Sequence, residues 1–292
     1  MEENRAKQAL LLGIILTASF FIIELIGGYI SGSLSLLSDA GHMLRDVLAL
    51  VLSLSAIRLA ARLPTKSRTF GYHRVEIMVA LFNGIMLLLI SGWIFYEAYN
   101  RITDPRSIDS TIMFGVAVIG LLVNAFVAWK LHGSHDLNIR SAFLHVLSDL
   151  MASVAVIVAA IIIHFTGYNV ADPILSIIIG ILILATSIKL VRDSLIILLD
   201  FTPNGVDMNE LIKDIENIKG VESVHNVHIW SLCSNVNVLD AHIYSDIKDV
   251  ERIEEIKYLI KEKLASYNIK HATLEFECNE CESPERIGRI VH

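Results

Sequence analysis

The chain lacks an excess of basic charge, and its first residues lack the pattern of a cleavable secretory signal. Its 292 residues include 24 lysines and arginines against 31 acids, which gives a formal net charge of −7. A nucleic-acid partner needs a basic surface that neutralises phosphates, so this balance argues against one. The N-terminal run M-E-E-N-R-A-K-Q leads into a long apolar stretch with no small-residue cleavage site, and predicts no removed peptide.

Cysteine is also rare. Only Cys233, Cys278 and Cys281 occur, all after residue 230. An odd number in a segment expected in the cytoplasm predicts reduced thiols rather than disulfides. Cys278 and Cys281 form a C-x-x-C, whose spacing suits zinc, but the signal is weak because no second C-x-x-C accompanies it.

Apolar residues, in contrast, are abundant and concentrated before residue 200. They make up 54% of the chain, and the mean hydropathy is +0.57, which exceeds that of a soluble domain. A membrane-spanning helix needs about 20 mostly apolar residues. Six such runs predict an all-α, six-helix transmembrane domain over 1–200 and a separate domain over 201–292. The runs are 9–29, 34–59, 75–99, 110–131, 142–165 and 173–194.

Basic residues alternate between the loops that join these runs. The loop after the second run is rich in arginine and lysine between 58 and 74, and the loop after the fourth holds Lys130 and Arg140. On the other side only Arg101 and Arg106 occur, with acids nearby. The positive-inside rule therefore predicts a multi-pass protein of the cell (inner) membrane with both termini in the cytoplasm.

Ionisable side chains are rare inside membranes and indicate function where they occur. The second run contains His42 and Asp46, and the fifth contains His145 and Asp149. Residues four apart lie on one face of a helix, so two facing pairs would supply the donors of a tetrahedral Zn²⁺ site. One His–Asp pair could instead link helices by hydrogen bonds, but the repeated spacing favours a metal site. Asp39, one turn before His42, is expected to support a ligand or to line the access path.

The pattern changes to short amphipathic segments after residue 200. The predicted order is helix, strand, strand, helix, strand, which fits a small α+β domain of the ferredoxin-like (αββαβ) kind. The predicted segments are 206–218, 221–232, 235–246, 249–267 and 271–278.

Histidine is frequent in these segments. His225, His228, His242 and His271 all fall in or beside predicted strands. Strict alternation along a strand places His228 on the opposite face from His225. The imidazoles and the C-x-x-C could bind metal together, or the histidines could satisfy hydrogen bonds on a solvated sheet.

Together these features resemble the cation diffusion facilitator family, and in particular its zinc-type branch. The resemblance covers nearly the whole chain and rests on the six runs and on distinctive motifs. It implies a homodimer in the lipid bilayer that exports divalent metal from the cytoplasm, usually in exchange for protons. A histidine in each intramembrane motif implies Zn²⁺ first, with Cd²⁺ or Co²⁺ as alternative substrates. The motifs are S-D-A-G-H-M-L-R-D, T-F-G-Y-H-R-V-E, H-V-L-S-D-L-M-A-S-V, A-D-P-I-L-S-I and V-H-N-V-H-I-W.

The resemblance also assigns roles to individual residues. It implies an ion pair between Arg74 and Asp200, and no further metal site in the loop after the second run, where Thr65, Arg68 and Tyr72 replace the usual ligands. It implies a second zinc site in the C-terminal domain, to which the C-x-x-C would contribute in the same or a neighbouring protomer. The implied ligands are His42, Asp46, His145 and Asp149 in the membrane, and His225, His242 and His271 with Cys278 and Cys281 in the C-terminal domain.

Two other classes of function compete with transport. An intramembrane zinc protease usually carries H-E-x-x-H, which this sequence lacks, and catalytic zinc keeps an open position that four protein ligands would fill. The chain is therefore predicted not to be an enzyme. A membrane-anchored, metal-responsive regulator would leave the intramembrane histidines and aspartates without a purpose, and it would move no metal in a vesicle assay.

Overall fold

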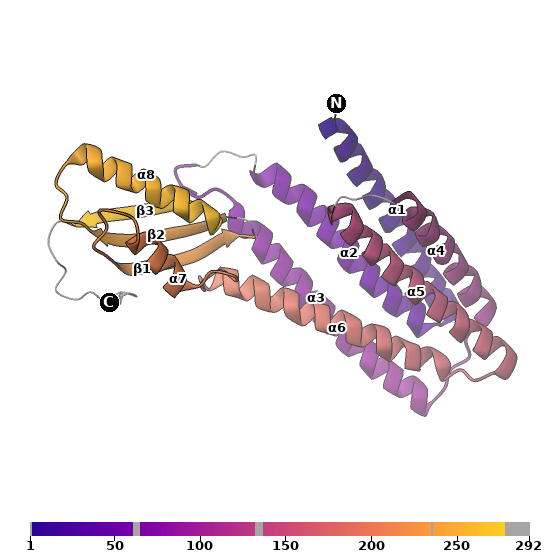
Figure 1. The fold of residues 1–292 in the computed structure, drawn as a ribbon. Helices are drawn as coiled ribbons and strands as arrows, with labels where there is room; N and C mark the ends of the chain where they lie inside the picture. Colours follow the sequence, from indigo (N-terminus) through magenta and orange to yellow (C-terminus); the bar gives the residue numbers. More distant parts are fainter. Residues whose placement is uncertain (1, 61–64, 132–136, 235, 278–292) are drawn as a thin grey trace. The chain divides into compact units, whose positions relative to one another are not determined.

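The computed structural model describes the backbone of residues 2–60, 65–131, 137–234 and 236–277. Side chains are described for 17–48, 65–129, 146–234 and 236–277. The described residues form two compact units (Figure 1). One unit combines residues up to 55 with 82–191, and the other combines 56–81 with the chain from 192 onward.

Six long helices make up the first part of the chain, and α2, α3 and α6 each have residues in both units. Each follows one of the six apolar runs, because long apolar stretches without interior proline satisfy their backbone hydrogen bonds as helices. The helices are α1 (Glu2–Ser31), α2 (Leu34–Ala60), α3 (His73–Thr103), α4 (Ser110–Leu131), α5 (Leu137–Thr166) and α6 (Ala171–Leu198).

Four of these helices are long and apolar enough to cross a membrane within the described residues. They are α3 and α6 over their full lengths, α4 over 110–129 and α5 over 146–166. The described apolar part of α1, Thr17–Ser31, is shorter. The predicted helical membrane domain agrees with this, while the number of six spans and the domain boundary at residue 200 stay predictions.

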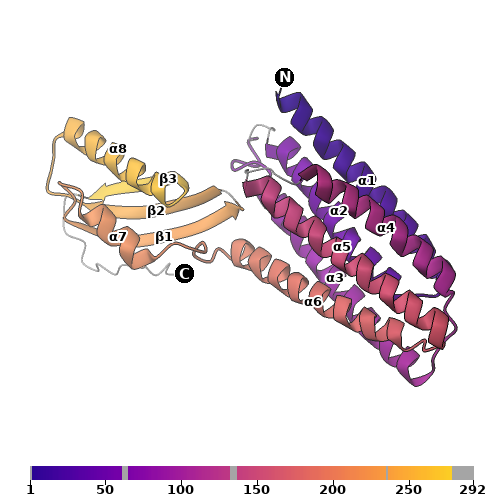
Figure 2. The same ribbon diagram turned by 45° about the vertical axis from the view of Figure 1, so that its right-hand side comes forward.

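Close packing in the helical unit depends on two glycines between α1 and α4. A Cβ atom on Gly120 of α4 would lie 2.3 Å from Phe20 of α1, and one on Gly27 of α1 would lie 2.5 Å from Val116 of α4. Larger residues would force the two backbones apart, so both helices carry their smallest residue at the contact. The α4 helix also packs along α5 (Figure 2).

The second unit contains a three-stranded sheet with the order β1-β2-β3. Its strands are β1 (Ser223–Cys233), β2 (Val236–Tyr244) and β3 (Ile269–Glu277), and its helices are α7 (Met208–Glu216) and α8 (Val250–Ser266). The β1 and β2 strands are antiparallel, whereas β2 and β3 are parallel and are joined through α8. The predicted order αββαβ is confirmed, while the finer ferredoxin-like assignment stays a prediction.

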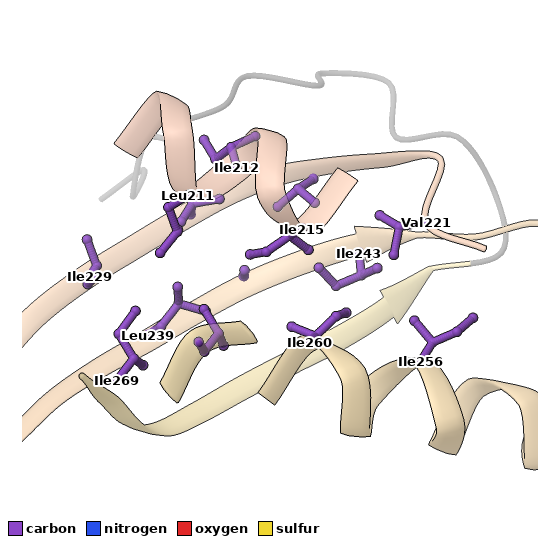
Figure 3. Packing of buried hydrophobic residues seen from close by; sticks show 14 residues of the cluster. Leu211, Ile212, Ile215, Val221, Ile229, Leu239, Ile243, Ile256, Ile260 and Ile269 are labelled. Carbon is purple, nitrogen blue, oxygen red and sulfur yellow. The ribbon is translucent and has the colours of Figure 1, made fainter. Parts of the chain in front are cut away.

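One hydrophobic core holds this small domain together. Both helices pack on the same face of the sheet, and Figure 3 shows Ile215 of α7 and Ile260 of α8 directed toward Leu239 and Ile243 of β2. These four side chains are fully buried. Burial of each contributes about 1.5–3 kcal/mol relative to exposure. The opposite face of the sheet is left for the polar residues described below.

Candidate metal centres

Three metal-ligating side chains converge between α2 and α5. The Nε2 atom of His42 lies 3.8 Å from Oδ2 of Asp46 on the same helix and 3.6 Å from Oδ1 of Asp149 on α5. One ligand atom from each of the three residues falls within 4.8 Å of the others. His42 and Asp46 share a face because they are four residues apart on a helix. Two helices thus bring together donors that are far apart in the sequence.

These three side chains are neither sealed in the core nor fully exposed. Their exposed fractions are 23% for His42, 16% for Asp46 and 24% for Asp149. Partial exposure leaves the donor atoms within reach of a small ion. One imidazole with two carboxylates suits Zn²⁺ and related divalent cations.

His145, the fourth predicted transport ligand, lies on α5 four residues before Asp149. Its side chain is outside the described residues, so its place at the site stays a prediction.

Two further carboxyl groups lie beside this cluster and are buried. Asp39 of α2 is 6% exposed and Glu24 of α1 is 1% exposed. The Glu24 carboxyl interacts with that of Asp39, and its Oε2 has no hydrogen-bond partner among the described residues. The supporting role of Asp39 stays a prediction, and the structure places Glu24, an isolated acid in an apolar run of the sequence, beside it.

A second cluster lies on the polar face of the C-terminal sheet. His225 of β1 and His242 of β2 are directly opposite each other in the strand register. Glu277 of β3 approaches both: its Oε1 is 2.7 Å from Nδ1 of His242, and its Oε2 is 3.2 Å from Nε2 of His225. One ligand atom from each of the three residues lies within 4.8 Å of the others.

His225 supplies an observation that points to a bound ion. The residue is 3% exposed, and neither ring nitrogen makes a hydrogen bond among the described residues, since the 3.2 Å approach to Glu277 lacks hydrogen-bond geometry. An unsatisfied buried polar group destabilises a protein by about 1–3 kcal/mol. A metal ion bound to an imidazole nitrogen would remove that penalty, so the residues present fit a zinc ion.

The structure does not bring His271 to this cluster. In the register of β2 with β3, His271 is the partner of Val238, whereas Glu275 is the partner of His242. His271 lies on the same face but four residues farther along, about 13 Å at the rise of a strand, and its ring contacts Phe70 edge-on with the centroids 6.1 Å apart. Glu277 occupies the position in the cluster that was predicted for His271.

Glu275 and Glu277 were missed in the sequence because carboxylates at alternate strand positions usually face solvent. Glu275 is 65% exposed, with Oε2 3.6 Å from Nε2 of His242, and stands as a fourth donor near the cluster. Both predicted cysteine ligands, Cys278 and Cys281, lie outside the described residues. Cys278 follows Glu277 directly in the sequence, and Cys281 comes three residues later.

A β-bulge overturns the expected direction of His228. The pairing shifts between His225 and His228, and Asn226 adopts a left-handed backbone conformation with φ of 49°. The extra residue returns His228 to the same face as His225, contrary to strict alternation. The Asn226 side chain then bridges two histidines, 3.0 Å from Nε2 of His242 and 3.1 Å from Nε2 of His228.

Two parts of the sequence match known protein-family domains. Residues 10–199 match the cation efflux transmembrane domain, and residues 203–277 match the cytoplasmic domain of cation efflux proteins. The chain belongs to the cation efflux family. It is therefore a transporter that exports divalent metal cations, and not an enzyme.

Individual relatives are similar in sequence to this chain over most of their length. The chain is 41% identical to the "cadmium, cobalt and zinc/H(+)-K(+) antiporter" of Bacillus subtilis, over 94% of this chain and 90% of that protein. It is 40% identical to the "metal cation efflux system protein CzcD" of Cupriavidus metallidurans, over 96% and 89%. It is 39% identical to the "zinc transporter ZitB" of Escherichia coli, over 97% and 91%.

The ion pair between Arg74 and Asp200, which the resemblance implies, is formed within the second unit. An Nη2 atom of Arg74, at the start of α3, lies 2.5 Å from Oδ1 of Asp200, two residues after the end of α6. Both side chains are nearly half exposed, so the pair is worth at most about 1 kcal/mol. Asp200 has a positive φ of 56°, which turns the chain out of α6.

In the loop between α2 and α3, the residues at the positions of the implied missing metal site contact one another. Arg68 stacks over the Tyr72 ring with 4.3 Å to its centroid. His73 places Nδ1 3.7 Å from Sγ of Cys233, which is buried at the end of β1. Thr65 and Arg68 pair with each other through their backbones.

Proposed function

We propose that this transporter exports Zn²⁺ from the cytoplasm in exchange for protons. The convergence of His42, Asp46 and Asp149 within one ion's reach, on helices predicted to lie in the membrane where charged groups are costly, supports the proposal. His145 completes a tetrahedral set of two imidazoles and two carboxylates.

The chemistry of this donor set supports Zn²⁺ as the principal substrate. Imidazole suits zinc, copper and nickel, whereas all-oxygen sites suit magnesium and manganese. The names of the relatives include cadmium and cobalt as well as zinc, so Cd²⁺ and Co²⁺ are proposed as alternative substrates.

Proton exchange follows from the protonation that metal binding requires. A ligating histidine must be neutral and a ligating aspartate ionised, so loading the site releases any protons held there. If the helices alternate the side to which the site opens, protons entering from outside displace the metal and are carried inward. The antiporter name of the Bacillus relative supports this coupling.

The C-terminal domain is proposed to bind zinc and to hold a homodimer together in the cytoplasm. Its match to a cytoplasmic domain supports that location, and the positive-inside rule then puts the N-terminus there too. His225, His242 and Glu277 are proposed as ligands, and the C-x-x-C as an additional donor in the same or the partner protomer.

Transport in proteoliposomes tests the intramembrane site. We expect His42→Ala, Asp46→Ala, His145→Ala and Asp149→Ala each to abolish Zn²⁺ uptake, because three ligands do not replace the hydration shell of the ion. The matched control is His164→Ala, because His164 lies at the far end of α5 and contacts Ser110. Wild-type transport by both Asp46→Ala and Asp149→Ala would refute the site.

Two further measurements test the substrate and the coupling ion. In His42→Asp, a harder ligand set with one more carboxylate should raise transport of Mn²⁺ relative to Zn²⁺. An acidic lumen should accelerate Zn²⁺ uptake into inverted vesicles, and uptake should make that lumen more alkaline. Uptake that ignores the pH gradient and moves no protons would exclude antiport.

A further inference from the structure

The Asp172 carboxylate, in the first turn of α6, accepts four hydrogen bonds from the start of α2. Its Oδ1 accepts from the Ser33 hydroxyl at 2.7 Å, from the Ser35 hydroxyl at 2.6 Å and from the Ser35 backbone N–H at 3.0 Å. Its Oδ2 accepts from the Leu34 backbone N–H at 2.6 Å. The carboxylate is fully buried, so the contact belongs to the interior of the helical unit.

These hydrogen bonds cap the N-terminus of α2, a role that an N-cap residue of the same helix usually has. The first four N–H groups of a helix have no partner inside the helix. Here Ser33 caps the Leu36 N–H at 3.2 Å, and Asp172 from another helix satisfies the Leu34 and Ser35 N–H groups. A negative charge at a helix N-terminus is favourable, and charge-assisted hydrogen bonds are short and strong.

Arg101 holds the capping carboxylate in place from a third helix. Its Nη1 lies 3.9 Å from Oδ2 of Asp172 and donates to the backbone oxygen of Gly32, between α1 and α2. Its Nε donates to Glu97 at 2.9 Å on the same face of α3. The buried charge of Asp172 is therefore paired, and one junction joins the ends of α1, α2, α3 and α6.

The described part of α2 also makes apolar contacts with two separate clusters. Leu36 of α2 belongs to an apolar cluster with residues of α4 and α5. Residues of α3 and α6, among them Ile94 and Ile183, form a separate cluster, which α2 approaches at Gly41. Apolar contacts slide more readily than hydrogen bonds with defined directions, so the Asp172 cap defines where α2 begins.

We infer that Asp172 is a positioning residue for the transport site. His42 lies seven residues after Ser35, about 10 Å along the helix, so fixing the first turn of α2 fixes the height and rotation of His42 and Asp46 relative to Asp149. A displacement of about 1 Å in such a constellation can reduce function about 100-fold. The inference rests on the proposed transport site, because its effect is exerted through those ligands.

The test compares Asp172→Asn with Ser176→Ala in proteoliposomes. Asparagine keeps the volume, but its NH₂ group faces a donor of α2. Ser176 is a buried neighbour whose hydroxyl donates to the Asp172 carbonyl oxygen, at 2.8 Å. We expect Asp172→Asn to raise the KM for Zn²⁺ about tenfold and to change the Zn²⁺/Cd²⁺ preference, while Ser176→Ala keeps both. A purely structural defect would lower the amount of active protein and leave KM and preference unchanged.

The Ser33→Ala and Ser35→Ala variants extend the test should Asp172→Asn fail to insert. Each removes one donor to Asp172, and we expect a smaller KM increase in the same direction. Wild-type KM and metal preference in the folded Asp172→Asn, or in both serine variants, would overturn the inference. An equal change in Ser176→Ala would also overturn it. Asp46→Ala is measured in parallel: if it transports, the proposed site is wrong, whereas an inactive Asp46→Ala beside an unaffected Asp172→Asn refutes only the positioning role.

Discussion

His225 is a buried imidazole that makes no hydrogen bond with any residue the structure describes, and its replacement by leucine should have opposite effects in the absence and presence of zinc. Leucine is similar in size and has no polar atoms. Without metal, the substitution removes the unsatisfied nitrogens. With metal, it removes a ligand. The sign of the stability change therefore reports whether the site binds zinc.

The magnitude follows from those two contributions. Relief of an unsatisfied buried group is worth about 1–3 kcal/mol, so His225→Leu should be as stable as the wild type in EDTA, or more stable by up to that amount. Zinc at 100 times its Kd stabilises the wild type by about 2.7 kcal/mol. The variant should lose most of that gain, and the order of stability should reverse.

Urea unfolding of a fragment over 201–292 measures the stability of the wild type and of His225→Leu, each without and with zinc. The core of the domain consists of residues from 211 to 269, so the fragment retains what holds the domain together. His271→Leu is the matched control, because His271 lies on the same sheet face but outside the cluster. The reasoning fails if His225→Leu is equally destabilised with and without zinc, or if His271→Leu alone abolishes the zinc effect.

Two further predictions concern packing and pH. Gly120→Ala places a Cβ atom 2.3 Å from Phe20 and should cost about 1–3 kcal/mol through overpacking, seen as a lower thermal midpoint in detergent. Gly115→Ala, with open space around it on the same helix, should show no loss. A hydrogen bond of 2.6 Å to Asp214 raises the pKa of Tyr267 from 10.0 to about 12. Its contribution to stability is present below pH 10 and lost as the pH rises through about 12, so the urea midpoint of Tyr267→Phe should fall less over that interval. Parallel pH curves for the two proteins would contradict this.

Features that depend on neighbours in the sequence could be predicted without the structure. The lengths of the apolar runs define helices, and α3 extends only a few residues beyond the predicted 75–99. The spacing of His42 and Asp46 requires a shared face on any helix. The order of elements after residue 200 also follows from local periodicity, and it is confirmed.

The members of the C-terminal cluster could not be predicted from local patterns. Whether His271 or Glu277 meets His242 depends on the register of β3 against β2, and a shift of a few residues exchanges one donor for the other. The direction of His228 depends on one extra residue at Asn226, which strict alternation does not include.

The sequence by itself determined the family, the helical membrane domain and the residue types available to bind metal, because hydrophobic length and helical spacing act over a few turns. Only the tertiary structure decided which donors meet: Asp149 with His42 across two helices, and Glu277 with His225 across a sheet. It also decided that Asp172 caps α2 from a distance of 138 residues along the chain. Contacts between distant segments depend on packing and strand register, and no local pattern encodes either.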